Sequence, residues 1–126
     1  MIDMNLLVAS GNAKFCQELA GYWTDFQVLC ADSAEEAELT LLEQNPGVVI
    51  YDLEPRGTLT LEALKVIRRI RPHIPVIVLA DEFCAANAGS KVLELGVFYL
   101  QPKPASRETL EALVESALQK TSQKSI

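Results

Sequence analysis

The stretch Val48-Val49-Ile50-Tyr51-Asp52 decides the fold, because it is apolar without alternation and ends abruptly at a carboxylate. Consecutive apolar positions are typical of a central strand that is covered on both faces, as in a parallel sheet. A second run of this type, Pro75-Val76-Ile77-Val78-Leu79, follows after one helical segment. The two runs therefore predict neighbouring central strands buried between layers of helices.

Working outward from these runs, strands and helices alternate along the whole chain, which is the pattern of parallel βαβ units. Further strands are expected at residues 6–9, 26–30 and 97–101, and the weakest helical pattern covers residues 85–95. Right-handed crossovers then predict a single doubly wound (βα)5 three-layer sandwich, with flavodoxin-like parallel strand order 2-1-3-4-5. We expect one domain over residues 1–120 and a polar C-terminal tail over residues 121–126.

Composition limits the class of protein. The chain has 126 residues, 49% of them hydrophobic, and a net charge of −6, which argues against nucleic-acid binding because phosphate neutralisation needs surplus Lys and Arg. Its apolar runs are too short to span a membrane, and no basic leader begins it, so we expect a cytoplasmic protein without a membrane anchor. The odd number of cysteines (Cys16, Cys30 and Cys84) predicts reduced, buried thiols.

Polar side chains cluster in the sequence where the predicted strands end. The carboxyl ends of parallel strands meet at one edge of the sheet, and function gathers there in doubly wound folds. Asp52 ends the third strand and Lys103 follows the fifth. We therefore expect Asp52 and Lys103 to lie side by side, with Lys103 paired either with Asp52 or with Asp81, which follows the fourth strand.

The runs around Asp52 and residues 74–80, together with Gly96 and the Lys103-Pro104 pair, resemble the receiver domains of bacterial two-component response regulators. The resemblance covers nearly the whole chain. It implies that Asp52 stands at the position that accepts a phosphoryl group from a histidine kinase. It also implies that Lys103 contacts the phosphoryl oxygens, with Pro104 at a position where the family has a cis peptide.

The sequence departs from the family at the positions that the chemistry needs. Ala9 and Ser10 stand where two carboxylates help to hold Mg²⁺, and neither side chain supplies the charge that this ion requires. Ala80 replaces the hydroxyl residue that ends the fourth strand, and the next position, usually small, carries the acidic Asp81. These departures favour an atypical receiver, or pseudo-receiver, in a phosphorelay. We expect it to act by binding another protein, without being an enzyme and without a metal or cofactor.

Two alternatives stay open. In the first, Asp52 is a working phosphoacceptor, phosphorylated by a histidine kinase with Mg²⁺ as cofactor. In the second, Ser10-Gly11-Asn12 opens a helix at which a flavodoxin-like protein would hold a cofactor phosphate, but a single glycine does not make a phosphate cradle.

Partner binding is expected on the face built from the fourth helix, fifth strand and fifth helix, as the resemblance implies. The partner would be a histidine kinase, a downstream effector or a second copy of the chain. The residues predicted for this face are Lys91, Glu94, Arg107, Glu108 and Glu111, around Val97 and Tyr99. The third helix is the rival surface, because it is basic at Lys65, Arg68 and Arg69. Its simplest interpretation is a solvated helix face.

Overall fold

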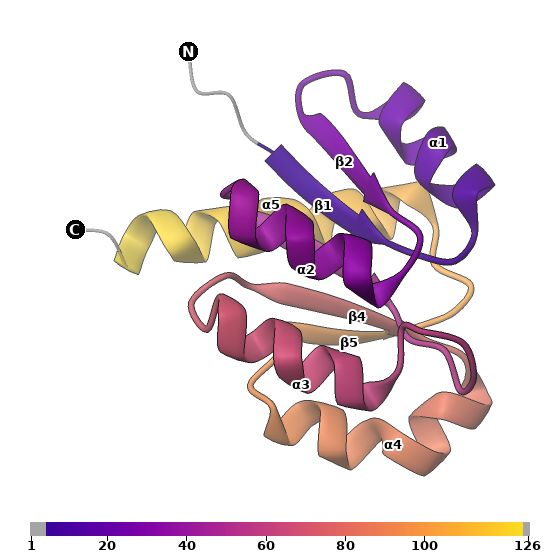
Figure 1. Ribbon diagram of the computed structural model, residues 1–126. Coiled ribbons are helices and arrows are strands. Elements are labelled where there is room, and N and C mark those ends of the chain that lie inside the picture. Colours follow the sequence, from indigo (N-terminus) through magenta and orange to yellow (C-terminus); the bar gives the residue numbers. More distant parts are fainter. Residues whose placement is uncertain (1–4, 125–126) are drawn as a thin grey trace.

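The computed structural model describes residues 5–124, in which five strands alternate with five helices (Figure 1). The strands are β1 (Asn5–Ala9), β2 (Gln27–Ala31), β3 (Val48–Asp52), β4 (Val76–Ala80) and β5 (Tyr99–Pro102). The helices are α1 (Ala13–Tyr22), α2 (Ala34–Glu43), α3 (Leu61–Ile70), α4 (Glu82–Glu94) and α5 (Arg107–Lys124). The predicted alternation is confirmed.

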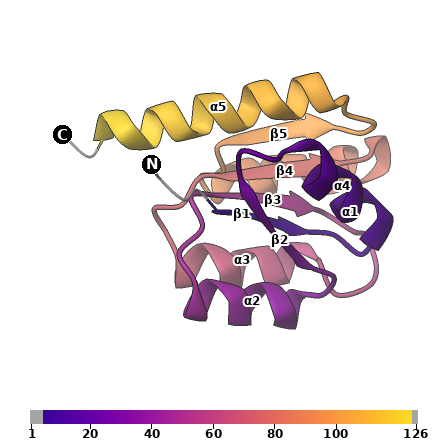
Figure 2. The same ribbon diagram turned by 90° about the horizontal axis from the view of Figure 1, so that it is seen from above.

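All strands are parallel, and their order across the sheet is β2-β1-β3-β4-β5, as predicted. In the second view, α5 lies on one side of the sheet, and α2 and α3 lie on the other (Figure 2). The molecule is thus a three-layer α/β sandwich of the flavodoxin-like type.

The apolar run of β3 serves two separate cores. Val49 and Tyr51 pack into the core under α2, α3 and α4, whereas Val48 and Ile50 pack into the core under α1 and α5. Successive side chains of a strand point to opposite faces, so a strand covered on both faces needs apolar residues at every position. This explains why β3, like β4, shows no hydrophobic alternation.

Side-chain caps fix where the helices begin. Asn12, Ser33, Thr60 and Asp81 each accept a hydrogen bond from a backbone N–H three residues ahead. Asp81 thereby starts α4 at Glu82, earlier than the predicted residue 85.

The fifth helix ends later than the sequence predicts. It continues to Lys124, through most of the segment expected to be a polar tail, because residues 121–124 contain neither proline nor glycine to interrupt it. Within residues 5–124, no helix is both long and apolar enough to cross a lipid bilayer.

Two arginines of the basic α3 region bind backbone carbonyl groups. The guanidinium of Arg68 donates hydrogen bonds to the carbonyl oxygens of Ile74, Leu95 and Gly96. Arg71 donates to the carbonyl oxygens of Leu41 and Gln44. Arg68 is half-buried, and this burial lowers its pKa from the ordinary arginine value. Arg68 therefore joins two loops to α3, which corrects its interpretation as an exposed cation of a docking surface.

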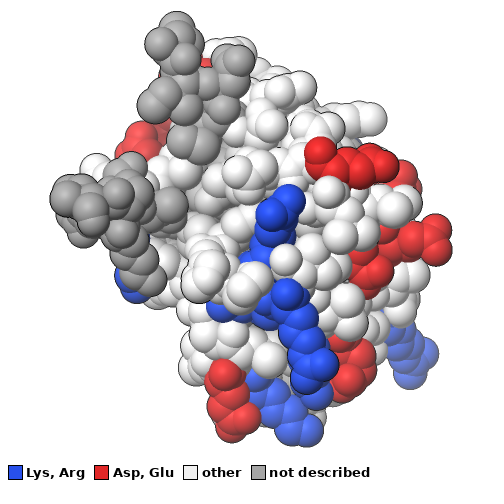
Figure 3. Space-filling view, turned by 60° about the vertical axis from the view of Figure 1, so that its left-hand side comes forward, with Lys and Arg blue, Asp and Glu red and all other residues white. Residues whose placement is uncertain are grey.

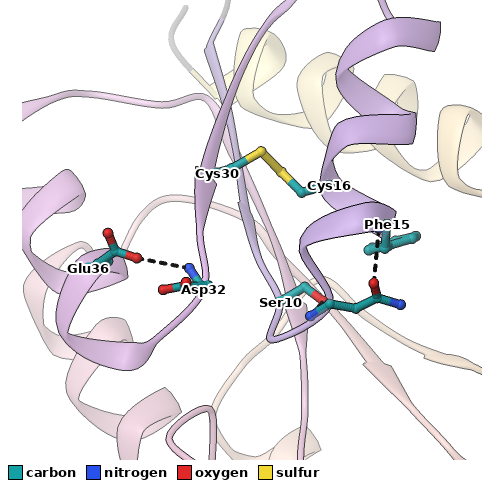
Figure 4. Close-up of a disulfide and its surroundings, with 7 residues drawn as sticks. Ser10, Phe15, Cys16, Cys30, Asp32 and Glu36 are labelled. Atoms are coloured by element: carbon teal, nitrogen blue, oxygen red, sulfur yellow. Dashed lines mark hydrogen bonds between the residues drawn. A yellow bond between two sulfur atoms is a disulfide. The ribbon is translucent and has the colours of Figure 1, made fainter.

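A disulfide joins α1 to the edge strand β2 (Figure 4). It links Cys16, which is buried, to Cys30, which is exposed. The prediction of reduced thiols is therefore wrong at these two positions. The chain returns from α1 to β2 and brings the two Cα atoms within 6.1 Å, a separation that a disulfide spans, although 14 positions separate them in the sequence. Cys84 is free and buried, as expected.

We expect the double variant Cys16→Ser/Cys30→Ser to lose about 3 kcal/mol of unfolding free energy, because a loop of roughly 15 residues is no longer closed in the unfolded chain. Urea denaturation of the oxidised protein and of the variant measures this difference. Cys84→Ser is the matched control, because it keeps the disulfide. A reducing agent should therefore still lower the free energy of unfolding of this variant. Equal stabilities of the oxidised protein and the double variant would contradict the assignment of a stabilising crosslink.

Candidate functional site

The site lies at the carboxyl edge of the sheet, around the last residue of β3. Asp52 is only 9% exposed, although it is a carboxylate. It lies there because the buried strand runs directly into it, and the backbone N–H of the next residue, Leu53, still bonds to the carbonyl oxygen of Leu79 in β4. The strand pairing therefore holds Asp52 within the sheet edge rather than on a free loop.

Both oxygens of the Asp52 carboxylate have partners. The ammonium of Lys103 lies 2.6 Å from Oδ1, and the hydroxyl of Ser10 donates a hydrogen bond of 2.8 Å to Oδ2. A buried carboxylate is stable only when it is paired and hydrogen-bonded in this way. The predicted placement of Asp52 beside Lys103 is confirmed, and of the two partners considered for Lys103 the structure selects Asp52.

Lys103 is aimed by the chain on either side of it. Its backbone N–H donates to the carbonyl oxygen of Ala80, which fixes the segment that follows β5 against the end of β4. The peptide bond between Lys103 and Pro104 is cis, as the resemblance implies. The side chain of Lys103 is 34% exposed, so its ammonium reaches a buried carboxylate from the rim of the sheet.

Ser10 has a role that the sequence analysis did not assign. The sequence places Ser10 at a missing acid and at the start of a helix, whereas the structure makes it a hydrogen-bond donor to Asp52 that also accepts from the backbone N–H of Asn12. The signal was present in the sequence, because Ser10 is a polar residue that directly follows a buried strand. That strand, β1, is the neighbour of β3, and Ala9 lies in register with Tyr51.

The last residues of β1 and β4 carry no acid. Ala9 and Ala80 are fully buried methyl groups. In the part of the chain that the structure describes, no group of three or more His, Cys, Asp and Glu side chains is arranged to hold a metal ion.

Asp81 is the N-cap of α4. It accepts a hydrogen bond of 2.8 Å from the backbone N–H of Cys84. This bond, together with a smaller contribution from the positive charge of Lys103, holds the pKa of Asp81 below its usual range. The pKa of the Cys84 thiol is raised, first by burial and then by the charge of Asp81. A thiol with a raised pKa is a poor nucleophile, in keeping with the structural role expected for Cys84.

The loop after Asp52 is held by its neighbours. The hydroxyl of Tyr51 donates a 2.6 Å hydrogen bond to the carbonyl oxygen of Thr60, and burial raises the pKa of this phenol. The carboxylate of Glu54 accepts from the backbone N–H of Leu59 and lies beside Gly11. The β1–α1 and β3–α3 loops therefore approach each other closely at this point.

A cavity of about 440 Å³ opens beside Asp52 and Lys103. It is lined by the carboxyl ends of β3, β4 and β5 and by the start of α1, with the residues Asn12, Phe15, Asp52, Leu79, Asp81, Lys103, Pro104 and Ala105. A small phosphorylated group could therefore approach Asp52 and Lys103 from this side.

The face predicted for partner binding is only partly free. Lys91, Glu94, Glu108 and Tyr99 are exposed, as expected, but Val97 and Glu111 are half-buried. Arg107, although exposed, lies 4.0 Å from the ring centroid of Tyr22, so this cation is engaged by the end of α1. The assignment of Arg107 to the partner-binding face stays a prediction.

We expect Lys103→Met to lower the free energy of unfolding by about 2 kcal/mol, because the buried charge of Asp52 loses its counter-ion while Lys103 itself is partly screened by solvent. Urea denaturation at neutral pH measures the loss. Adding Asp52→Asn to Lys103→Met should recover part of it, since the neutral amide needs no counter-ion. The exposed Lys91→Met is the matched control, and a Lys103→Met variant as stable as that control would show that the pair contributes nothing.

No model of a protein family matches the sequence. Among curated proteins, the chain is 36% identical over 75 residues, or 60% of its length, to a protein-glutamate methylesterase/protein-glutamine glutaminase of Agrobacterium fabrum. The match covers 21% of that protein, so the chain spans about a fifth of the length of the curated relative it matches.

Among solved structures, a response regulator receiver protein from Pseudomonas putida is 29% identical, with a TM-score of 0.81 over 92% of this chain and 98% of that chain. An adenylate cyclase structure from Rhodopirellula baltica has a TM-score of 0.88 over 98% of this chain and 93% of that chain, but at 19% identity it shows a shared fold alone. The chain therefore has the fold of the receiver domains of two-component response regulators.

Proposed function

We propose that this receiver domain signals by binding another protein, and that Mg²⁺-dependent phosphorylation of Asp52 is impaired. The observation that carries the proposal lies at the end of β1, where Ala9 offers only a buried methyl group and Ser10 donates a 2.8 Å hydrogen bond to Asp52 in place of a metal-binding acid. Lys103 pairs with the other carboxylate oxygen at 2.6 Å, and this contact is compatible with either function of Asp52.

The residues of the site do not fit a Mg²⁺ ion. Mg²⁺ is held through carboxylates in near-octahedral geometry, and the two strand-end positions nearest to Asp52 on β1 carry the methyl of Ala9 and the hydroxyl of Ser10. The Ser10 hydroxyl donates a hydrogen bond to Asp52, and it carries no negative oxygen that could bind the ion. No catalytic step through this ion is therefore assigned to the chain.

The charge balance also opposes phosphoryl transfer. Stabilisation of a transferring phosphoryl group depends on cations and on positioned hydrogen-bond donors around its oxygens. Here Lys103 is the cation beside Asp52, while Ala80 offers no hydroxyl and Asp81 adds a negative charge at the mouth of the cavity. The chain itself is proposed to have no enzymatic activity, whatever further domains accompany it.

A working phosphoacceptor is the second candidate function. It is favoured by the contact between Asp52 and Lys103 and by the open cavity of about 440 Å³ next to them. The two functions differ in whether a divalent cation and a phosphate mimic bind at this edge of the sheet.

Leu93 and Tyr99 are the exposed apolar residues that support partner binding on the face of α4 and β5. Their exposed fractions are 57% and 47%. The two elements pack against each other, and Gly89 in α4 faces the side chain of Leu100 in β5. We propose that a histidine kinase, a downstream effector or a second copy of the chain docks on this face.

We predict that Mg²⁺ at millimolar concentration causes no saturable change in the ¹⁵N-HSQC signals of residues around Asp52, with or without beryllofluoride, because the carboxylates of a metal site are missing. The variant Ala9→Asp/Ser10→Asp should bind Mg²⁺ and then beryllofluoride. Adding Asp52→Asn to that variant is the control and should abolish binding. Saturable Mg²⁺ binding by the unmodified protein would favour the phosphoacceptor function instead.

Leu93→Ser/Tyr99→Ser is expected to weaken binding of a purified partner at least tenfold, since buried apolar anchors dominate most interfaces. Isothermal titration with a partner first identified by crosslinking gives the comparison. Lys65→Glu/Arg69→Glu is the matched control on α3, and it spares the structural Arg68. If only the α3 variant loses affinity, the docking face is assigned to the wrong helix.

A further inference from the structure

A second cavity lies at the amino edge of the sheet, at the opposite end of the strands from Asp52. Its volume is about 460 Å³, within the range of pockets that hold small molecules. The loop from α3 to β4, the loop from α4 to β5 and the last part of α5 form its walls. Nothing in the receiver chemistry around Asp52 uses this cavity.

The cavity is lined by basic side chains and, within the described part of the chain, by no acidic one. Arg68, His73 and Lys120 line it from three different segments. Figure 3 shows Lys and Arg side chains down the middle of one face, with Asp and Glu side chains beside the lower part of this band. On a protein with a net charge of −6, a cavity lined by basic side chains is a place where an anion is attracted rather than repelled.

Arg68 makes the cavity a preformed one. Its three hydrogen bonds to backbone carbonyl oxygens hold the guanidinium and both loops in place, and the guanidinium has further N–H groups to offer. A ligand anion would therefore meet a cation whose side-chain entropy has already been lost, which lowers the entropic cost of binding.

The other wall of the cavity is apolar. Phe98 lines it together with Pro72 and Pro75, and the ammonium of Lys120 lies 5.7 Å from the centroid of the Phe98 ring. An aromatic ring and a cation thus stand next to each other. A flat ring can take the place of the Lys120 ammonium over Phe98, while that ammonium turns to pair with a negative group attached to the ring.

We propose that this cavity binds an aromatic phosphate of mononucleotide size, with its phosphate at Lys120 and Arg68 and its ring against Phe98. The cavity volume, the cationic lining and the aromatic wall each match one part of such a molecule. An inorganic anion would use only the cations, and an uncharged ring would use only the apolar wall.

Titration of the ¹⁵N-labelled protein with AMP, adenosine and inorganic phosphate in separate series tests the proposal at low ionic strength. AMP should shift the signals of residues 72–75 and 96–98 in a saturable manner, with at least tenfold higher affinity than either adenosine or phosphate. Lys120→Glu should reduce the AMP affinity at least tenfold. The matched control, Lys14→Glu, carries the same charge change on an exposed residue of α1 and should leave the AMP affinity within twofold.

Four results would overturn the proposal. The first is the absence of saturable shifts with AMP, and the second is equal affinity for AMP and inorganic phosphate, which would reduce the cavity to a general anion-attracting surface. The third is an equal loss of affinity in Lys120→Glu and Lys14→Glu, because the effect would then follow net charge rather than the cavity. A Lys120→Ala variant with a native ¹⁵N-HSQC spectrum and undiminished AMP binding would contradict the proposal in the same way.

Discussion

The carboxylate of Asp52 is the group on which the functional edge of the sheet depends. A carboxylate with 9% exposure is costly in free energy unless nearby groups replace the water that it has lost. Lys103 and Ser10 do so from the ends of β5 and β1, so one buried charge ties together three segments that are far apart in the sequence. In a receiver fold this arrangement places an ion pair at the carboxyl edge of the sheet.

At the opposite edge of the sheet, positive side chains are likewise held by hydrogen bonds to polar groups of distant segments. There Arg68 and Arg71 satisfy backbone carbonyl oxygens at the ends of α2 and α4 and in the α3–β4 loop. Cations are favourable near helix C-termini, where carbonyl groups lack partners. The acidic Asp52 and these arginines thus lie at opposite edges of the sheet, which gives the small domain two chemically different ends.

Most of the fold could be predicted from the sequence, because the apolar runs of β3 and β4 have only one stable environment, between two layers of helices. The contact between Asp52 and Lys103 also followed, since parallel strands bring their carboxyl ends to one edge. Contacts that depend on the exact distance between two side chains could not be predicted from the sequence. The donation from Ser10 to Asp52, the stacking of Arg107 on Tyr22 and the Cys16–Cys30 disulfide each need a distance that residue order does not supply. The function of Arg68 was missed for the same reason, because an arginine on a helix looks solvated until its carbonyl partners are known.

The central proposal is that Mg²⁺-dependent phosphorylation of Asp52 is impaired, because Ala9 and Ser10 stand where carboxylates would hold the ion. Intact-mass spectrometry after incubation with phosphoramidate and Mg²⁺ tests it directly, with Ala9→Asp/Ser10→Asp as the variant in which the missing carboxylates are supplied. The account predicts an unmodified mass for the wild-type protein under conditions in which the variant gains a phosphoryl group on Asp52. Stoichiometric phosphorylation of Asp52 in the wild-type protein would contradict it.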